Sequence, residues 1–335
     1  MSNGVLYVGD NLEVLRLFFS DLVDLIYLDP PFNTGRKFIS ADGAKSGSFN
    51  DVWNWSMIPQ DWSDQLRSDW PDLYQLVDLS GRTHSQAMSS FLCFMAVRLI
   101  ELHRVLKHTG SIFLHCDPTA SHYLKAIMDR IFGSKNFRNE IIWSYRKMPN
   151  NAKHFQKNHG TILFYSKGPE YTFNKQYEDY TEATKRNYER AAKVGYNINY
   201  KKGMATVWDW NKYNAAIEAG KIRDPDKLKP VEFEGKGSAM RAVWDIPILA
   251  PTSKERTGYP TQKPLALLDR ILRAACPEGG VVLDPFAGSG TTLLAAELLN
   301  MEWIGIDIWD GLADLLGARF RSRGLEAQID EVTAP

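Results

Sequence analysis

Two segments of this sequence place an acidic side chain where a ligand can reach it. Residues 281–292 (VVLDPFAGSGTT) begin with an apolar run that ends at Asp284 and continue into a glycine-rich turn. Glycines in such a turn let a ligand approach the main chain closely. A second carboxylate, Asp307, ends the next apolar run and can accept hydrogen bonds from a ribose diol. Together these features indicate a nucleoside-type ligand.

The residues after the glycines narrow the class of nucleoside ligand. A P-loop requires a lysine directly after its last glycine, but Gly290 is followed by Thr291. The dinucleotide fingerprint requires a third glycine, and Leu293 stands at that position. A ligand with a ribose and a cationic amino acid, such as S-adenosyl-L-methionine (AdoMet), needs carboxylates and no pyrophosphate cradle. We therefore expect AdoMet at this turn.

The second segment, residues 25–33 (LIYLDPPFN), suits chemistry on an amine. The N6 amine of adenine is a poor nucleophile because its lone pair is delocalised into the ring. The Asp29 carboxylate and the Pro30 carbonyl, which Pro31 restricts, can accept hydrogen bonds from both amine hydrogens and favour a tetrahedral nitrogen. Phe32 offers a flat face for stacking the base. A turn that merely caps a strand explains the proline pair but not the whole tetrapeptide, so we predict methyl transfer to an extruded base.

Strands and helices alternate around these two segments. This rhythm predicts a Rossmann-like α/β fold, doubly wound around a mostly parallel sheet. If the strands before Asp29 and Asp284 are neighbours where the strand order reverses, methyl donor and amine acceptor meet in one crevice. We expect strands at 5–8, 23–28, 111–115, 140–145, 281–283 and 303–307, and helices at 11–19, 86–107, 119–132, 263–275 and about 290–299.

Residues 40–85 are polar and rich in tryptophan, and we interpret them as a long lid-like loop with short helices. Packing against the rest of the protein is the alternative for most of these tryptophans. No apolar run is long enough to span a membrane, and the first residues do not resemble a secretory signal, so we expect a cytoplasmic protein. The three cysteines form no CxxC pair, which argues against disulfides and against a zinc site.

The formal net charge of the 335 residues is zero, but the charge is unevenly distributed. Residues 141–241 carry 19 Lys and Arg against 11 Asp and Glu, together with 16 aromatic residues. We interpret this region as a DNA contact, with basic side chains on phosphates and others reaching base edges. A tyrosine-rich packed subdomain is the alternative. The candidate DNA contacts are Lys185, Arg186, Lys201 and Lys202.

Other polar residues carry no predicted chemistry. Four histidines show no metal-ligand spacing, and we interpret them as structural or surface residues, with no metal expected. Three arginines near the C-terminus are interpreted as a solvated face. The histidines are His115, His122, His154 and His159, and the arginines are Arg319, Arg321 and Arg323.

The motifs together resemble the β-class amino-methyltransferases of DNA, which include type II and type III modification enzymes. DPPF at 29–32 resembles the catalytic motif IV, and DPFAGSGTT at 284–292 resembles the AdoMet motif I. TQKP at 261–264 resembles motif X, while GDN at 9–11 and GID at 305–307 resemble two further elements of the class. The catalytic motif precedes the AdoMet motif, as in this circularly permuted class.

The resemblance implies a discontinuous catalytic domain at 1–145 and 241–320, an inserted target-recognition region at 146–240 and a C-terminal tail at 321–335. It also implies a site-specific DNA methyltransferase that modifies double-stranded DNA with AdoMet as cofactor. The implied cofactor-binding residues are Asp10, Asn11, Lys263, Asp284, Pro285, Phe286, Gly288, Ser289, Gly290, Thr291 and Asp307.

Adenine N6 is the favoured target, because N4-cytosine enzymes more often carry serine at the position of Asp29. Cytosine N4 stays open, as does a non-catalytic DNA-binding subunit of a modification complex, although the intact motifs argue against the latter. Phe32 replaces the commoner tyrosine, a change that preserves stacking. A methyltransferase acting on RNA or protein is a further alternative. A cognate restriction enzyme and a homodimer are open as partners.

Overall fold

The computed structural model describes residues 4–32, 37–39, 48–148, 153–326 and 329–333. Its contacts divide the chain into two compact units. The main unit comprises Met1–Asn174 and Ala242–Pro335, and the inserted unit comprises Lys175–Arg241. No helix among the described residues is long and apolar enough to cross a membrane.

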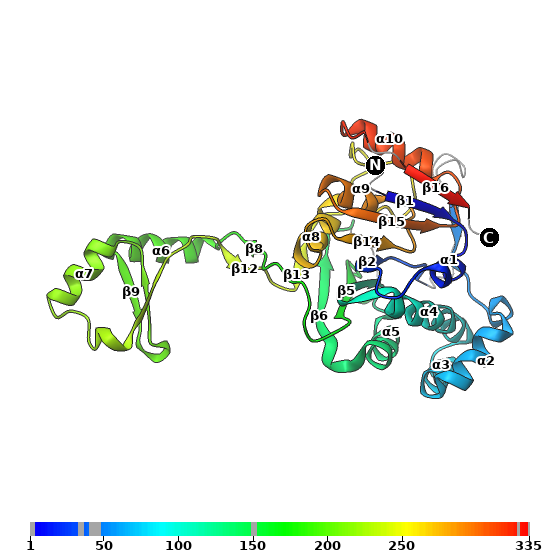
Figure 1. Ribbon diagram of the computed structural model, residues 1–335, viewed down its shortest axis with the longest axis horizontal. Helices are drawn as coiled ribbons and strands as arrows, with labels where there is room; N and C mark the ends of the chain where they lie inside the picture. Colours follow the sequence, from blue (N-terminus) through cyan, green and yellow to red (C-terminus); the bar gives the residue numbers. More distant parts are fainter. Residues whose placement is uncertain (1–3, 33–36, 40–47, 149–152, 327–328, 334–335) are drawn as a thin grey trace. The chain divides into compact units, whose positions relative to one another are not determined.

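A nine-stranded sheet forms the centre of the main unit, with the order β13-β6-β7-β5-β2-β14-β15-β1-β16 (Figure 1). Every pair of neighbours in this order is parallel except the two pairs that include β7. The predicted mostly parallel α/β sheet is therefore confirmed. The strands are β1 (Gly4–Val8), β2 (Val23–Leu28), β5 (Leu106–Cys116), β6 (Phe137–Ser144), β7 (His159–Ser166), β13 (Val243–Asp245), β14 (Val281–Asp284), β15 (Glu302–Asp307) and β16 (Ile329–Thr333).

The helices of the main unit pack in two groups, α1 to α5 and α8 to α10 (Figure 1). All six residues of β2 are buried, as expected of a parallel strand that is covered on both faces. The helices are α1 (Asn11–Leu17), α2 (Gln60–Asp69), α3 (Pro71–Thr83), α4 (Gln86–Val105), α5 (Ser121–Met128), α8 (Leu265–Ala275), α9 (Thr291–Leu298) and α10 (Leu312–Ser322). A π-helical turn, Asp129–Gly133, extends α5, and short 3₁₀ helices lie at Trp55–Met57 and Ser134–Asn136.

Of the lid-like loop with short helices predicted at 40–85, the helices are present, but the described part packs on the core and does not form a lid-like loop. Helices α2 and α3 pack against α4, and they bury Leu66, Leu73 and Val77 in the main core. Trp53 and Trp62 also pack against this core, so tryptophan here serves burial. Two short strands, β3 (Lys37–Ile39) and β4 (Ser48–Asn50), pair with each other. Residues 40–47 lie outside the described part.

Two boundaries differ from those expected. The inserted unit begins at Lys175 rather than at residue 146, because β7 lies in the central sheet between β6 and β5. Burial of β7 between two neighbours outweighs the polar composition of the residues around it. The expected tail at 321–335 supplies β16, which pairs in parallel with β1 at the edge of the sheet.

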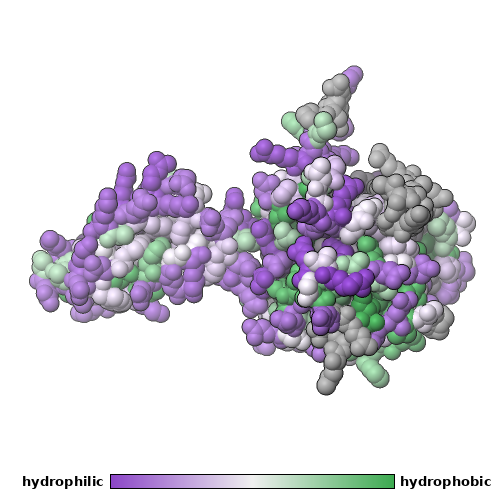
Figure 2. Space-filling view, turned by 90° about the horizontal axis from the view of Figure 1, so that it is seen from above, coloured by the Kyte–Doolittle hydropathy of each residue, from purple (hydrophilic) through white to green (hydrophobic). Residues whose placement is uncertain are grey.

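The inserted unit has a core of its own, formed by Ala205, Val207, Tyr213, Ala216, Ile222 and Leu228. Hydrophilic residues cover much of the face that Figure 2 shows for this unit. Its elements are α6 (Glu182–Val194), α7 (Trp210–Glu218), a sheet of β9 (Tyr196–Asn199), β10 (Met204–Val207) and β11 (Lys229–Glu232), the pair β8 (Tyr177–Glu178) and β12 (Ser238–Ala239), and 3₁₀ helices at Tyr200–Lys202 and Pro225–Lys227.

Candidate active site

The two acidic turns lie at the ends of neighbouring strands. β2 pairs in parallel with β14, and Ile26 stands opposite Leu283. Asp29 directly follows β2, and Asp284 ends β14, so both carboxylates lie at one edge of the sheet. From this pair the chain continues outward in opposite directions, from β2 to β5 and from β14 to β15. This is the reversal of strand order at which open α/β sheets bind ligands.

A cavity of about 380 Å³ opens at this edge, a size common for small-molecule sites. All four residues of the tetrapeptide line it, and so do all but one of the predicted cofactor-binding residues. The exception is Gly290, the N-cap residue of α9, whose φ is +70°. A Cβ at Gly290 would lie 2.9 Å from the Leu316 side chain. Gly290 therefore permits the turn and its packing. The cofactor-site residues that line the cavity are Asp10, Asn11, Lys263, Asp284, Pro285, Phe286, Gly288, Ser289, Thr291 and Asp307.

Main-chain hydrogen bonds fix the two carboxylates of the glycine-rich turn. The Gly288 N–H donates to Asp307 Oδ2 at 2.7 Å, and the Phe286 N–H donates to Asp284 Oδ1 at 3.0 Å. Burial raises the pKa of Asp284 to about 7 and raises the pKa of Asp307 as well. A cation in the cavity would favour the ionised form of both carboxylates, so the site is suited to a positively charged ligand.

The charged residues that line the cavity also favour a positively charged ligand. Five carboxylates line it, against the two cations Arg98 and Lys263. Arg98 pairs with Asp10, and Lys263 pairs with Asp29. Acidic residues therefore outnumber basic residues in the lining, which favours a cationic ligand over one that carries phosphates. The five acids are Asp10, Asp29, Asp51, Asp284 and Asp307.

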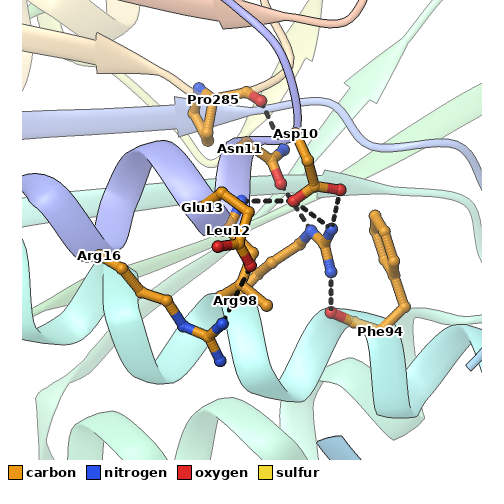
Figure 3. Close-up of polar contacts among 8 residues, drawn as sticks. All are labelled: Asp10, Asn11, Leu12, Glu13, Arg16, Phe94, Arg98 and Pro285. Carbon is orange, nitrogen blue, oxygen red and sulfur yellow. Dashed lines mark hydrogen bonds and ion pairs between the residues drawn. The ribbon is translucent and has the colours of Figure 1, made fainter. Parts of the chain in front are cut away.

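A cluster of polar contacts around Arg98 ties the N-terminal loop to the glycine-rich turn (Figure 3). Asn11 Nδ2 donates to the Pro285 carbonyl at 2.7 Å, while Asn11 Oδ1 accepts from Arg98 Nε at 2.6 Å. Arg98 also donates to Asp10 Oδ2 at 2.7 Å, and its guanidinium lies 3.5 Å from the centre of the Phe94 ring. Both polar ends of Asn11 are thus engaged within the protein. Sequence reasoning missed Arg98, whose only signal was a cation within an apolar helix.

Arg319 supports the same turn from α10, so the solvated face predicted for it is wrong. The side chain is buried, and it donates to the Ser289 carbonyl at 2.5 Å and to Thr291 Oγ1 at 3.1 Å. The carbonyl and hydroxyl at the start of α9 offset the cost of burying the guanidinium. Arg321 and Arg323 are exposed, as predicted.

Asp29 lies between a cation and a neutral ring. Lys263 Nζ donates to Asp29 Oδ2, while Oδ1 lies 3.3 Å from His115 Nδ1 and accepts no hydrogen bond from any described residue. Burial raises the pKa of Asp29, and Lys263 opposes this rise. Burial, with Lys263 adding to it, holds the pKa of His115 well below its usual value, so the imidazole is neutral. The site thus keeps one buried carboxylate oxygen available to a donor.

His115 is the next-to-last residue of β5, lies beside Asp29 and is a site residue that sequence reasoning missed. Its Nδ1 shares a 3.1 Å hydrogen bond with the Tyr27 hydroxyl. Its ring lies 5.5 Å from both the Phe32 ring and the Trp143 ring. The available signal was its position at the end of an apolar strand directly before Cys116-Asp117, which repeats the pattern of the two acidic turns.

A second cavity, of about 430 Å³, adjoins the first at Phe32 and Lys263, which line both cavities. His115 and Trp143 line its wall, and Tyr259 is shared with the first cavity. Phe32 and Lys263 therefore lie at the boundary of two adjoining cavities. Five aspartates line the first cavity, whereas the second has the single acid Asp117 beside Lys147, Lys157 and Arg256. Adjoining cavities suit two ligands that meet at the shared boundary.

The predicted DNA contacts all belong to the inserted unit, and none lines either cavity. Lys185 pairs with Glu182 at 2.9 Å, and Arg186 donates to the Glu182 carbonyl. Lys201 and Lys202 lie in an exposed 3₁₀ helix. Among the described residues, no three His, Cys, Asp or Glu side chains are grouped so that they could hold a metal ion.

Known proteins resemble this chain along most of its length. Residues 23–316 match the N6_N4_Mtase family, described as DNA methylase. The Mod subunit of the type III restriction-modification enzyme StyLTI from Salmonella typhimurium is 30% identical over 346 residues, which cover 90% of this chain and 51% of that protein. The DNA adenine methyltransferase YhdJ from Escherichia coli is 28% identical over 302 residues, which cover 90% of this chain and 76% of YhdJ.

Solved structures share the fold at lower identity. A Thermus thermophilus protein in complex with S-adenosyl-L-methionine has a TM-score of 0.51 at 18% identity, and the match covers 99% of both chains. The PvuII DNA methyltransferase (cytosine-N4-specific) has a TM-score of 0.53 at 16% identity, covering 99% of this chain and 95% of that one. This chain spans about half the length of the StyLTI Mod subunit. The resemblance expected from the motifs is confirmed, and the chain belongs to the N6_N4_Mtase family of DNA methylases.

Proposed function

We propose that this protein transfers a methyl group from AdoMet to the N6 amine of an adenine extruded from double-stranded DNA. The observation that carries the proposal is the boundary that two cavities share at Phe32 and Lys263, with Asp29 paired to Lys263 in the first cavity. One cavity suits a cationic nucleoside, and the other is lined by rings that suit a planar base. Asp29 lines the first cavity, and its Oδ1, which accepts no hydrogen bond from a described residue, lies 3.3 Å from His115 Nδ1 in the wall of the second.

The first cavity fits AdoMet by its charge and its shape. Asp307 supplies a carboxylate for a ribose diol, and Asp284 adds negative charge to a site that holds no unpaired cation among its described residues. Gly288 has a φ of +54°, and a Cβ there would lie 3.3 Å from the Tyr259 ring, so glycine keeps this part of the cavity open. When bound, AdoMet supplies a methyl group on a sulfonium sulfur that a nucleophile can attack.

On the acceptor side, the protein acts by positioning and by electrostatics. Asp29 accepts a hydrogen bond from one amine hydrogen, and the Pro30 carbonyl accepts the other, which favours the tetrahedral nitrogen that attacks a methyl group. Phe32 stacks on the base. The proton leaves the nitrogen after the methyl group has arrived, so Asp29 need not be a strong base. The neutral His115 adds no second cation beside Asp29.

Adenine is the base best supported by the relatives, because YhdJ is named as a DNA adenine methyltransferase. Cytosine N4 is the second candidate, because the PvuII enzyme with the same fold is cytosine-N4-specific. Mass spectrometry of nucleosides from DNA methylated by the purified protein separates the two. N6-methyladenine supports the proposal, and N4-methylcytosine alone would replace adenine by cytosine.

Radiolabelled AdoMet and duplex DNA test the activity itself. We expect label in DNA with the wild type and none with Asp29→Ala, while calorimetry shows that this variant still binds AdoMet. Asp284→Ala is expected to lose AdoMet affinity. Persistent transfer by Asp29→Ala would remove the catalytic assignment, and unchanged affinity in Asp284→Ala would remove the cofactor assignment. A wild type that binds AdoMet but never labels DNA would favour the non-catalytic subunit.

We also propose that the inserted unit, 175–241, reads the target sequence. Its support is that the unit is inserted in the sequence between the two segments of the main unit and that it carries exposed basic residues. Charge removal at Lys185, Arg186, Lys201 and Lys202 is expected to weaken DNA binding and to reduce its salt dependence.

The StyLTI relative is one subunit of a restriction-modification enzyme, so a cognate restriction enzyme is a proposed partner. We also propose that this protein self-associates into a homodimer. We propose a cytoplasmic location for it.

A further inference from the structure

The described residues between β6 and β7, 145–148 and 153–158, include Tyr145, Lys147 and Lys157, which line the second cavity. We name these described residues the hairpin loop. β6 runs antiparallel to β7, which runs antiparallel to β5, so β6 is parallel to β5 and β2. The carboxyl end of β6 therefore lies at the same edge of the sheet as Asp29. The Tyr145 N–H donates to the Asn158 carbonyl at 3.0 Å and closes the base of the loop. Residues 149–152 lie outside the described part.

The charged side chains of the hairpin loop are all basic. It contains Arg146, Lys147, Lys153 and Lys157 and no Asp or Glu. Lys147 and Lys157 line the second cavity, and neither forms an ion pair with a described residue. Lys147 Nζ lies 4.9 Å from the centre of the Tyr145 ring, which orders its stem without neutralising its charge. A cavity with two unneutralised lysines at its rim attracts a polyanion.

The same loop exposes a large apolar side chain. Phe155 is 99% exposed, the most exposed of the large apolar residues described, and Met148 is 90% exposed. The backbone at Phe155 is held by the 2.8 Å contact of its carbonyl with His154 Nδ1. Burial of a phenylalanine side chain is favourable, so the exposed Phe155 indicates a surface that becomes covered by a partner. Because the neighbouring cavity rim is basic, we expect a partner with an anionic exterior and an apolar interior. Duplex DNA is such a partner, with phosphates outside and stacked bases within.

We propose that the hairpin loop holds the duplex at the point of base extrusion, with Lys147 and Lys157 on the phosphates beside the target nucleotide and Phe155 in the stack that the target base leaves. This inference rests on the proposed function, because it assumes an extruded base in the second cavity. Extrusion breaks stacking and pairing, and an apolar side chain inserted between base steps offsets part of that loss. Phe155 is thus a positioning residue that does not touch the reacting atoms.

The test uses the full chain and a synthetic duplex. The methylated sequence is first identified by sequencing modified bases in DNA from cells that express the wild type. Two duplexes then carry this sequence, one with the target base paired and one with an abasic site opposite it. The abasic duplex costs less to open, because the target base has no pairing partner to lose.

For Phe155→Ala we expect kcat/KM on the paired duplex to fall about tenfold or more, a change of about 1.4 kcal/mol. On the abasic duplex the variant should approach the wild type, and Phe155→Trp should retain activity on both. AdoMet binding by calorimetry should not change. The matched control is Phe19→Ala, because Phe19 is 84% exposed and precedes β2 at the opposite edge of the sheet. Equal activity of Phe155→Ala and wild type on the paired duplex, or an equal loss on both duplexes, would overturn the role of Phe155.

The phosphate contacts are tested by the salt dependence of binding. Lys147→Gln with Lys157→Gln should weaken binding to all sequences alike and reduce the slope of log affinity against log salt by about two. Lys135→Gln is the control, because Lys135 is exposed and precedes β6 at the opposite edge. An unchanged slope in the double variant would overturn this part. If the wild type methylates no DNA at all, the proposed function fails and not the hairpin loop alone.

Discussion

Lys263 Nζ binds the carboxylate of Asp29 across 234 positions of the sequence. The lysine comes from the turn before α8, and the aspartate from the end of β2. The same Nζ lies 5.7 Å from the centre of the Phe32 ring. The sequence predicted Lys263 as a cofactor-binding residue, and the structure adds a contact with the proposed catalytic carboxylate. One cation is therefore shared between the two cavities.

This ion pair makes the activity of the protein sensitive to pH. Burial raises the pKa of Asp29, and the positive charge of Lys263 lowers it. Asp29 must be ionised to accept a hydrogen bond from the amine with full strength. Lys263→Met removes the lowering charge, so the pKa of Asp29 rises and the acidic limb of the kcat profile moves to higher pH.

The measurement is kcat against pH at saturating AdoMet, so that weaker cofactor binding does not mimic the effect. Lys263→Arg keeps the positive charge, and its acidic limb should stay near that of the wild type. An acidic limb at the same pH in wild type and Lys263→Met would show that the ion pair does not set the ionisation of Asp29.

Gly160 controls the position of His115 from the neighbouring strand. A Cβ at Gly160 would lie 2.5 Å from His115 Nε2, so Gly160→Ala must displace the imidazole from its place beside Asp29 and Phe32. We expect kcat to fall about tenfold or more, since small displacements of reacting groups are costly, while AdoMet affinity stays unchanged because His115 lines only the second cavity.

A matched substitution is Gly317→Ala in α10, where the added Cβ would approach only the flexible end of the Arg321 side chain within 3.4 Å. Turnover and AdoMet affinity of Gly317→Ala should equal those of the wild type. If Gly160→Ala lost AdoMet affinity as strongly as turnover, the separation of the two cavities at Phe32 would be wrong.

Arg98 is predicted to matter for stability. Its side chain is 1% exposed and supplies hydrogen bonds to both Asp10 and Asn11. Arg98→Met leaves the buried Asn11 amide oxygen without its donor and removes the ion pair with Asp10, so we expect a loss of about 2 kcal/mol in the free energy of unfolding. Urea denaturation monitored by circular dichroism measures this loss. Arg82→Met, which removes an exposed ion pair with Asp78, should change stability by less than about 0.5 kcal/mol. Similar losses in the two variants would contradict the role of the cluster around Arg98.

The sequence alone identified the residues that form the two acidic turns of the site. A short apolar run that stops at Asp29-Pro30-Pro31 favours a strand with a carboxylate at its end, because proline ends the ladder. The glycines around Gly288 and the acidic end of the next strand, Asp307, likewise reveal a nucleoside site, because only a few residue types permit such a turn. Both conclusions depend on short stretches of sequence, because Asp29 directly follows its strand and Asp307 lies 19 positions after Gly288. For the same reason, the strands and helices that flank the two turns were predicted close to their observed bounds.

Only the tertiary structure decided which distant groups meet. The pairing of Lys263 with Asp29, the placement of His115 against Phe32 and the burial of Arg98 and Arg319 depend on packing between elements far apart in sequence. The polar context of β7 concealed a central strand, and tryptophans that suggested a lid proved to be packing residues. Local propensity is weak compared with the free energy of burial, so the sequence identified the reacting groups, and the fold determined their neighbours and their charge states.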